Sequence, residues 1–222
     1  MIRAVLFDLD GTLADTAPDM ARTVNAMCAR RGLEPVAEKT VRPYVSQGAR
    51  GMIRAAFGVM PEHPDYAAMR EEFLEIYAGN LCVDTRLFPG MDTVLERLES
   101  DGIAWGVVTN KFERFARPLI DLLGLGERAG VVIGGDTCPR PKPFPDSLLH
   151  AAQALGVAPK ETLYVGDDER DVQAARAAGM PVIVAGYGYL GSDRPPALWG
   201  ADAIIGSPAG ITEWIGEVEA AR

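Results

Sequence analysis

The chain has 222 residues, of which 48% are hydrophobic and 24% charged, a composition typical of a folded globular protein. This length suits one domain, or one domain with an insertion. The formal net charge of −9 argues against binding to nucleic acid or to an anionic membrane surface. Three widely spaced cysteines, with no early signal segment and no apolar stretch long enough to span a bilayer, predict a reduced cytoplasmic protein.

The first predicted element is a short apolar strand at 4–7, which runs directly into Asp8-Leu9-Asp10-Gly11-Thr12. Side chains two positions apart on a strand share a face, so Asp8 and Asp10 are expected to lie together at its carboxyl end. Two close carboxylates repel each other, and Mg²⁺ would relieve the repulsion, leaving Asp8 ionised as a nucleophile and Asp10 free to move protons. The alternative is a solvated turn, because Asp and Gly are ordinary turn residues.

Helical patterns follow. One helix is predicted to start after Thr16, whose side chain is expected to cap it. Further helices are expected at 38–45, 48–57 and 65–81. The turn Leu87-Phe88-Pro89-Gly90 ends this region and places short hinge strands near 14–17 and 84–88. These patterns predict an inserted helical unit.

Beyond the insertion, short apolar runs alternate with amphipathic helical stretches. The runs lie at 103–108, 131–133, 162–165 and 181–185. Strands that alternate with helices imply a parallel sheet, and continuous apolarity implies helices on both faces. We therefore predict an α/β fold with a doubly wound parallel-sheet, Rossmann-like core at 1–14 and 88–222, and an all-α unit at 15–87. The segment 192–196 is interpreted as a polar loop. In such folds ligands bind at the carboxyl ends of the strands, where Asp8 and Asp10 are placed.

Two further polar signals follow predicted strands. Thr109-Asn110 offers a hydroxyl and a helix N-terminus to a phosphate oxygen, although a routine cap of the helix from about Glu113 is the alternative. Lys142 lies between two prolines, which hold it in a rigid turn. Because the chain has only four lysines against eighteen arginines, a lysine here indicates a site that needs a compact ammonium group. Contact of Lys142 with both Asp8 and a phosphate would neutralise nucleophile and electrophile together. A solvated loop lysine is the alternative.

The last signal is Gly166-Asp167-Asp168-Glu169-Arg170-Asp171, directly after the predicted strand at 162–165. Asp167 and Asp171 are four positions apart and can share one face of a helix start. Acids at one edge of a parallel sheet converge, so Asp167 is expected to join Asp8 in binding Mg²⁺. The alternative is a favourable interaction of these acids with the helix dipole.

In this order, the motifs resemble those of the haloacid dehalogenase-like phosphatases. The helical insertion is similar to the small α-helical cap of the phosphoglycolate phosphatase branch. Three further segments are similar to that branch, namely Val108-Thr109-Asn110-Lys111, Gly134-Gly135-Asp136-Thr137 and Tyr187-Gly188-Tyr189. The resemblance implies an aspartyl-phosphate on Asp8, with Asp10 protonating the leaving alkoxide and then activating water. It also implies Mg²⁺ held by Asp8, Asp167 and the backbone carbonyl of Asp10.

By the same resemblance, four groups would stabilise charge on the phosphoryl oxygens: Thr109, Lys142 and backbone amides near Leu9 and Asn110. Asp171 would orient Lys142 or metal-bound water. Asp168 stands where the family commonly has serine. We interpret it as a helix cap, and the alternative is an altered affinity for the metal.

The cap is expected to close over the site and to determine specificity. Gly48 and Arg50, in the segment that opens a cap helix, suit a carboxylate or sugar hydroxyls, although this is also an ordinary glycine-containing helix start. Lys111 and Arg114 are further candidates for substrate binding, with solvated helix charges as the alternative. His63 and His150 are interpreted as surface residues.

The expected substrate is a small phosphorylated metabolite, with 2-phosphoglycolate first. N-acetylmuramate 6-phosphate is a close second, because bacterial phosphatases of that substrate resemble this chain at 46–50 and 199–202. A phosphomutase and a non-catalytic metabolite-binding module are less favoured. Dehalogenation is disfavoured, because the dehalogenases of this superfamily lack the second carboxylate and this chain keeps Asp10. The protein is expected to be a monomer or a homodimer.

Overall fold

The structure, a computed structural model, describes residues 1–191 and 194–220. Its centre is a six-stranded parallel sheet in the order β5-β4-β1-β6-β7-β8. The strands are β1 (Ala4–Phe7), β4 (Ala104–Val108), β5 (Val132–Ile133), β6 (Thr162–Gly166), β7 (Val182–Ala185) and β8 (Ala203–Ile205). The predicted parallel sheet is confirmed. The edge strand β8 was not predicted, since its three residues are too few to show a pattern and Ile204 is 46% exposed.

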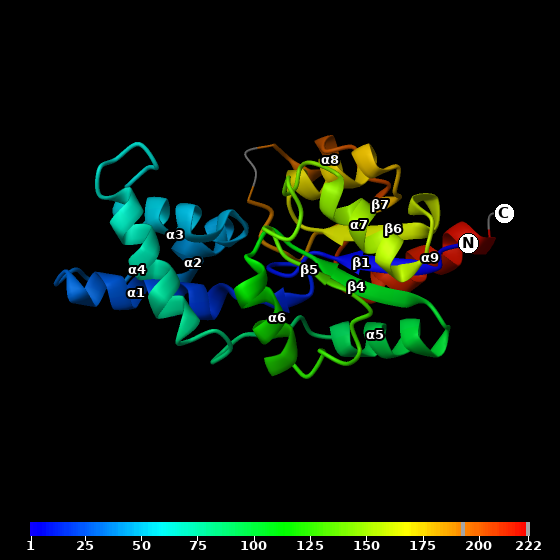
Figure 1. Ribbon diagram of the computed structural model, residues 1–222, viewed down its shortest axis with the longest axis horizontal. Coiled ribbons are helices and arrows are strands. Elements are labelled where there is room, and N and C mark those ends of the chain that lie inside the picture. Colours follow the sequence, from blue (N-terminus) through cyan, green and yellow to red (C-terminus); the bar gives the residue numbers. More distant parts are fainter. Residues whose placement is uncertain (192–193, 221–222) are drawn as a thin grey trace.

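Helices cover both faces of this sheet (Figure 1). One face carries α7 (Asp146–Leu155) and α8 (Glu169–Ala178). The other carries α5 (Met91–Ser100), α6 (Glu113–Leu122) and α9 (Gly210–Ala220). The side chains of β1 alternate between the two hydrophobic clusters, with Val5 and Phe7 in one and Leu6 in the other, all fully buried. The doubly wound core is therefore confirmed.

A helical unit lies at the carboxyl ends of the strands, on the left of Figure 1. It consists of α1 (Ala17–Arg30), α2 (Glu38–Val41), the 3₁₀ helix η1 (Arg42–Gln47), α3 (Gly48–Phe57) and α4 (Tyr66–Ala78). We call residues 17–78 the cap. Two short antiparallel strands, β2 (Ala14–Asp15) and β3 (Arg86–Leu87), join it to the core. They lie where hinge strands were predicted but are shorter, and the domain limits at 15 and 87 stay a prediction.

Three local predictions for the cap need correction. A continuous helix at 38–45 is wrong, because the ring of Pro43 cannot continue an α-helix and the chain passes into η1. The helix predicted at 65–81 is shorter and ends at Ala78, with Asp65 as its N-cap residue. Thr16 occupies the N-cap position of α1, but its side chain makes no capping bond and donates instead to Asp10 Oδ1 at 2.6 Å.

The return hinge is tied to the cap by a buried carboxylate. Asp19 of α1 accepts hydrogen bonds from the backbone N–H groups of Val83, Asp84 and Thr85 at 2.9–3.1 Å. The Thr85 hydroxyl also donates to it, at 2.7 Å. Hydrogen bonds to an ionised acceptor are stronger than neutral ones, so this cluster fixes the start of the return path to the core.

Of the predicted polar loop 192–196, residues 192 and 193 lie outside the described residues, and Pro196 begins a 3₁₀ turn, η3 (Pro196–Leu198). None of the helices within 1–191 and 194–220 has the length and apolarity that crossing a membrane requires.

Candidate active site

The site forms where the central strands end. Asp8 and Asp10 follow β1, Thr109 follows β4 and Asp167 follows β6. Since β1 pairs in parallel with both β4 and β6, the three strand ends lie side by side. Gly11, at φ +90°, turns the chain after Asp10, and a Cβ at this position would collide with the Asp167 carboxylate. The structure therefore brings together the strand-end residues that the sequence singled out.

Three buried carboxylates form the deepest part of the site. Oxygens of Asp8, Asp167 and Asp171 lie within 4.8 Å of one another. Burial, with smaller contributions from the neighbouring carboxylates, raises the pKa of Asp8 to about 6 and that of Asp167 well above its usual range. Asp167 accepts hydrogen bonds from neutral donors: the Tyr189 N–H at 2.9 Å and the hydroxyls of Thr12 and Ser46, each at 3.2 Å.

These residues fit a hard divalent cation. Carboxylate oxygens are the ligands that Mg²⁺ prefers, and a cation would compensate the excess negative charge on Asp8 and Asp167. The sequence-based set consists of Asp8, Asp167 and the backbone carbonyl of Asp10, whereas the third carboxylate of the cluster is that of Asp171. The metal ligands stay a prediction.

Lys142 neutralises two of the acids. Its Nζ lies 2.9 Å from Asp8 Oδ1 and 2.7 Å from Asp171 Oδ1, and its side chain is 3% exposed. It also donates to the Val108 carbonyl and lies 2.9 Å from the Tyr164 hydroxyl. Although burial lowers the pKa of Lys142, the charges of Asp171 and Asp8 outweigh it and raise that pKa on balance. The expected contacts of Lys142 with Asp8 and Asp171 are present.

The main chain of Lys142 is held by Asn110. The Asn110 side-chain amide donates to the Lys142 carbonyl, and its oxygen accepts from the Lys142 N–H, both at 2.9 Å. Sequence reasoning assigned Asn110 only a backbone amide near phosphate and missed this clamp. An asparagine directly after a strand end was the available signal.

Two other predicted phosphate contacts look different in detail. Thr109 is buried at the cavity, and its Oγ1 accepts a hydrogen bond from the Lys111 N–H at 3.1 Å. The Leu9 N–H donates to Asp8 Oδ1 at 2.8 Å. The Leu9 amide therefore already serves the carboxylate of Asp8, and its role toward phosphate stays a prediction.

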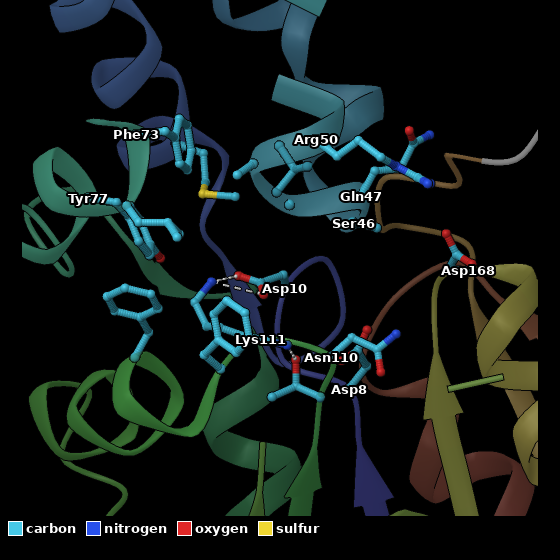
Figure 2. Close-up of a pocket in the computed structure, with 18 of the residues that line it drawn as sticks. Asp8, Asp10, Ser46, Gln47, Arg50, Phe73, Tyr77, Asn110, Lys111 and Asp168 are labelled. Atoms are coloured by element: carbon cyan, nitrogen blue, oxygen red, sulfur yellow. Dashed lines mark hydrogen bonds and ion pairs between the residues drawn. The ribbon is translucent and has the colours of Figure 1, made fainter. Parts of the chain in front are cut away.

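Lys111 pairs with Asp10. Its Nζ lies 2.7 and 3.0 Å from the two carboxylate oxygens of Asp10, and its side chain is 6% exposed (Figure 2). Burial alone would lower the pKa of Lys111, but the charge of Asp10 outweighs it and raises that pKa. The alternative of a solvated helix charge is thus wrong for Lys111, which precedes α6. Arg114, by contrast, is exposed and lies over the Phe115 ring.

Asp168 is the N-cap residue of α8, as its interpretation as a helix cap predicted. Its side chain accepts from the Arg170 N–H at 2.9 Å, and Asp171 accepts from the Asp168 N–H, which completes a capping box. Asp168 also pairs with the Arg170 guanidinium at 2.8 Å, and this guanidinium donates to the Ser46 carbonyl of the cap at 2.8 Å. Asp168 thereby holds an arginine that joins core and cap.

A cavity of about 230 Å³ separates the strand ends from the cap. Its core side carries the charged groups described above. The lining also includes an apolar wall, formed by Phe73, Leu74 and Tyr77 of the cap and by Phe112 and Phe115 of the core. Gly48 and Arg50 also line it, as expected, whereas His63 and His150 are exposed and lie outside the lining. Sequence reasoning missed Tyr77, because a buried tyrosine in a helix is ordinary in a core.

Comparison with known proteins gives consistent matches. Residues 5–185 match the family described as haloacid dehalogenase-like hydrolase. A phosphoglycolate phosphatase of Xanthomonas campestris is 48% identical over 214 residues, covering 95% of each chain. An N-acetylmuramic acid 6-phosphate phosphatase of Pseudomonas aeruginosa is 45% identical over 207 residues, covering 93% of this chain and 92% of that one.

The fold has close counterparts among solved structures. The crystal structure of a predicted phosphoglycolate phosphatase from Haemophilus somnus superposes with a TM-score of 0.84 at 29% identity. The match covers 96% of this chain and 98% of the other. The expectation of an enzyme from a phosphatase family is therefore confirmed.

Proposed function

Because this chain belongs to the haloacid dehalogenase-like hydrolases and is a phosphatase, we propose that it hydrolyses a small phosphomonoester through an aspartyl-phosphate on Asp8. The observation that carries the mechanism is the placement of Asp8. Its carboxylate lines the cavity, and Lys142 Nζ lies 2.9 Å away. A buried carboxylate paired with one ammonium is held in place for in-line attack on phosphorus.

The neighbouring groups divide the remaining tasks. Lys142 and Thr109, at the same strand ends, stabilise charge on the phosphoryl oxygens as the bond to Asp8 forms. Asp10 also faces the cavity, where it gives a proton to the departing alkoxide and later takes one from the attacking water. Thr16 and Lys111 hold the Asp10 carboxylate in this position.

Mg²⁺ is proposed as the cofactor, held by Asp8, Asp167 and the backbone carbonyl of Asp10, with Asp171 beside them. When bound, the ion supplies positive charge that offsets repulsion between the phosphoryl group and the carboxylates. The buried cluster supports this assignment, because Lys142 pairs with Asp8 and Asp171 only, and burial raises the pKa of Asp167 so that its ionised form needs a further cation.

For the substrate, 2-phosphoglycolate is the first candidate. Support comes from the names of several relatives and from Lys111, a buried cation beside Asp10 that suits a short acid. A second candidate is N-acetylmuramate 6-phosphate, named in relatives from two Pseudomonas species. The aromatic and aliphatic wall of the cavity favours it, because glycolate has little apolar surface to place there.

The test is Mg²⁺-dependent release of phosphate from p-nitrophenyl phosphate by wild type and Asp8→Asn. The variant is expected to lose at least about 10⁴-fold in kcat, since the nucleophile is removed. Asp101→Asn, at an exposed residue outside the cavity, is the control and is expected to keep full activity. Equal rates for Asp8→Asn and wild type would contradict the proposal.

The substrate is then decided by kcat/KM for the two candidates on one preparation. A ratio above about tenfold, or ~1.4 kcal/mol in transition-state binding, selects the better substrate. For the metal, MgCl₂ is expected to raise the melting temperature of wild type but not of Asp167→Asn. A shift that persists in Asp167→Asn would place the ion elsewhere.

A further inference from the structure

One polar atom in the cavity has no partner. Tyr77, from α4 of the cap, is 2% exposed, and its hydroxyl makes no hydrogen bond to any described residue. A buried hydroxyl without a partner destabilises a protein, and most buried polar atoms in native structures are paired. Tyr77 lines the cavity together with Asp10 and Lys111. The open hydrogen-bonding position therefore belongs to the space that a substrate occupies.

The ring of Tyr77 is held in place by its neighbours. It stacks on Phe73 of the cap, with ring centroids 6.1 Å apart, and meets the edge of Phe115 of the core at 5.7 Å. Lys111 Nζ lies 4.8 Å from the Tyr77 ring centroid. Figure 2 shows Tyr77 on the cap side of Lys111 and Asp10, with its oxygen toward them. Such packing leaves the hydroxyl little freedom to turn away from the cavity.

The hydroxyl is a neutral donor beside a cation. Burial is the main cause that raises the pKa of Tyr77 to about 12, so the proton is retained near neutral pH. The hydroxyl oxygen can face the Lys111 ammonium, which only donates, and still keep its own proton for an acceptor in the cavity. Two donors that face one space fit an anionic acceptor with two oxygens.

The position of that acceptor follows from Asp10. Lys111 Nζ is 2.7 Å from Asp10 Oδ1, and a carboxyl group that protonates the ester oxygen lies about 2.7 Å from it. The ammonium is thus within about two hydrogen-bond lengths of the ester oxygen. A carboxylate separated from the ester oxygen by a single carbon atom therefore lies within reach of Lys111. An acid group on the far side of a sugar ring does not.

We propose that Tyr77 and Lys111 together bind a carboxylate on the leaving alcohol, next to the phosphoester carbon, and that Tyr77 is a specificity-determining residue of the cap. This inference rests on the proposed phosphatase mechanism and narrows its substrate to phosphate esters of short 2-hydroxy acids. The carboxylate would share Lys111 with Asp10 and would satisfy the Tyr77 hydroxyl. In the free protein the unpaired Tyr77 hydroxyl is destabilising, and it is kept because it binds the substrate.

The test compares two esters of nearly equal size, 2-phosphoglycolate and ethyl phosphate, which differ by a carboxylate in place of a methyl group. Wild type is expected to prefer 2-phosphoglycolate by at least tenfold in kcat/KM. Tyr77→Phe is expected to lose about 10- to 100-fold on 2-phosphoglycolate, mainly through KM, and less than twofold on ethyl phosphate. Tyr44→Phe, a cap tyrosine outside the cavity lining, is the matched control and should match wild type on both.

A second pair of variants checks the cation. Lys111→Met is expected to lower the preference for 2-phosphoglycolate by at least as much as Tyr77→Phe, while Lys160→Met at an exposed site leaves it unchanged. Binding without turnover is measured by calorimetry on Asp8→Asn. Adding Tyr77→Phe to that variant should weaken 2-phosphoglycolate binding about tenfold or more.

The outcomes separate this inference from the proposed function. Wild type active on both esters, with Tyr77→Phe unchanged or equally impaired on the two, overturns the inference alone. A wild type that releases phosphate from p-nitrophenyl phosphate but from neither ester also overturns the inference alone, whereas one that is inactive on all three overturns the proposed function and this inference with it. Without substrate, Tyr77→Phe should melt at or above the wild-type temperature, because it removes an unpaired buried hydroxyl. A clearly lower melting temperature would show a structural role and contradict the inference.

Discussion

The two sides of the cavity are built differently. On the core side, the side chains of Lys142 and Asp171 are 3% and 2% exposed and bond to each other at 2.7 Å. On the cap side, Arg50 is exposed and no hydrogen bond or ion pair joins it to another described residue, and Tyr77 has an unpaired hydroxyl. The core thus carries prearranged charges, and we infer that the cap carries groups left open for the substrate.

This difference has a geometric origin. Neighbouring strands lie about 4.8 Å apart, so residues at the ends of β1, β4 and β6 are placed by the backbone of the sheet itself. The cap is joined to this sheet through two-residue strands, β2 and β3, so its orientation depends on few backbone bonds. We expect such a division, with a fixed reaction centre under a separately attached cap, to permit changes of substrate without changes of chemistry.

The sharpest way to test the rigid side is Lys142→Met. The loss of the ammonium leaves Asp8 and Asp171 uncompensated, and we expect kcat to fall about 10²- to 10³-fold. The free energy of unfolding should fall by about 3 kcal/mol at pH 8. This deficit should shrink at pH 5, because Asp8, whose pKa is already raised to about 6, takes up a proton as the pH falls.

Urea unfolding at both pH values and steady-state rates provide the measurements for Lys142→Met. Lys160→Met, which removes an exposed lysine, is the control and should change neither quantity. If Lys142→Met kept wild-type kcat, the core side would not be the charged reaction centre described here.

A second test uses matching asparagine clamps on the two sides. Asn110 holds the main chain of Lys142 with two hydrogen bonds, and Asn25 of the cap holds that of Val36 in the same way at 2.8 and 3.1 Å. Each Asn→Ala change should lower the free energy of unfolding by about 1–3 kcal/mol. Only Asn110→Ala should also lower kcat, by about 10-fold or more, through displacement of Lys142. Equal losses of kcat in both variants would remove the distinction.

The junction between the two sides is tested at Asp168. Asp168→Ala removes the N-cap of α8 and the partner of Arg170, and should cost about 1 kcal/mol in the free energy of unfolding. Asp168→Ser keeps a capping oxygen, so its cost should be only a few tenths of a kcal/mol. Equal losses for Ala and Ser, measured by urea unfolding, would show that the Arg170 pair matters more than the helix cap.

The smallest effect is expected within the cap, at Glu72. Its pKa is lowered mainly by the hydrogen bond from Arg31, with Arg30 adding to it. A lowered carboxyl pKa stabilises the folded protein above the unfolded pKa and loses that contribution as pH falls through the folded value. Glu72→Gln should cost about 0.5 kcal/mol at pH 7 and nothing near pH 3. Glu75→Gln, on the same helix, is the control, and a cost at pH 7 that persisted at pH 3 would contradict the prediction.

Much of the core was predictable because its signals are local. Each apolar run that ends in Asp8, Thr109 or Asp167 marks a strand end, and parallel strands bring their ends together. The cap helices were harder, since Pro43 interrupts a helical pattern that is otherwise continuous. The edge strand β8 was missed, because three residues at the border of a sheet depend on pairing with β7 and not on their own pattern.

Side-chain pairing was the least predictable level. Lys111 looked like a charge at a helix start, yet folding buries it against Asp10. Thr16 looked like a helix cap, yet its backbone is in the αR region and not in the extended region typical of a capping residue, and its hydroxyl donates to the Asp10 carboxylate. In both cases the deciding partner lies on another element, so periodicity and capping rules do not reveal it.

The sequence by itself determined the α/β class, the strand-end acids that gather at one site and the phosphatase family to which the chain belongs. Hydrophobic patterning and charge repulsion act between neighbouring residues and leave a signature along the chain. Only the tertiary structure decided which cation pairs with which acid, and which hydroxyl in the cavity is left without a hydrogen-bond partner. Lys142 belongs to Asp8 and Asp171, Lys111 to Asp10, and Tyr77 is left open, because these pairings depend on distances between elements that only packing sets.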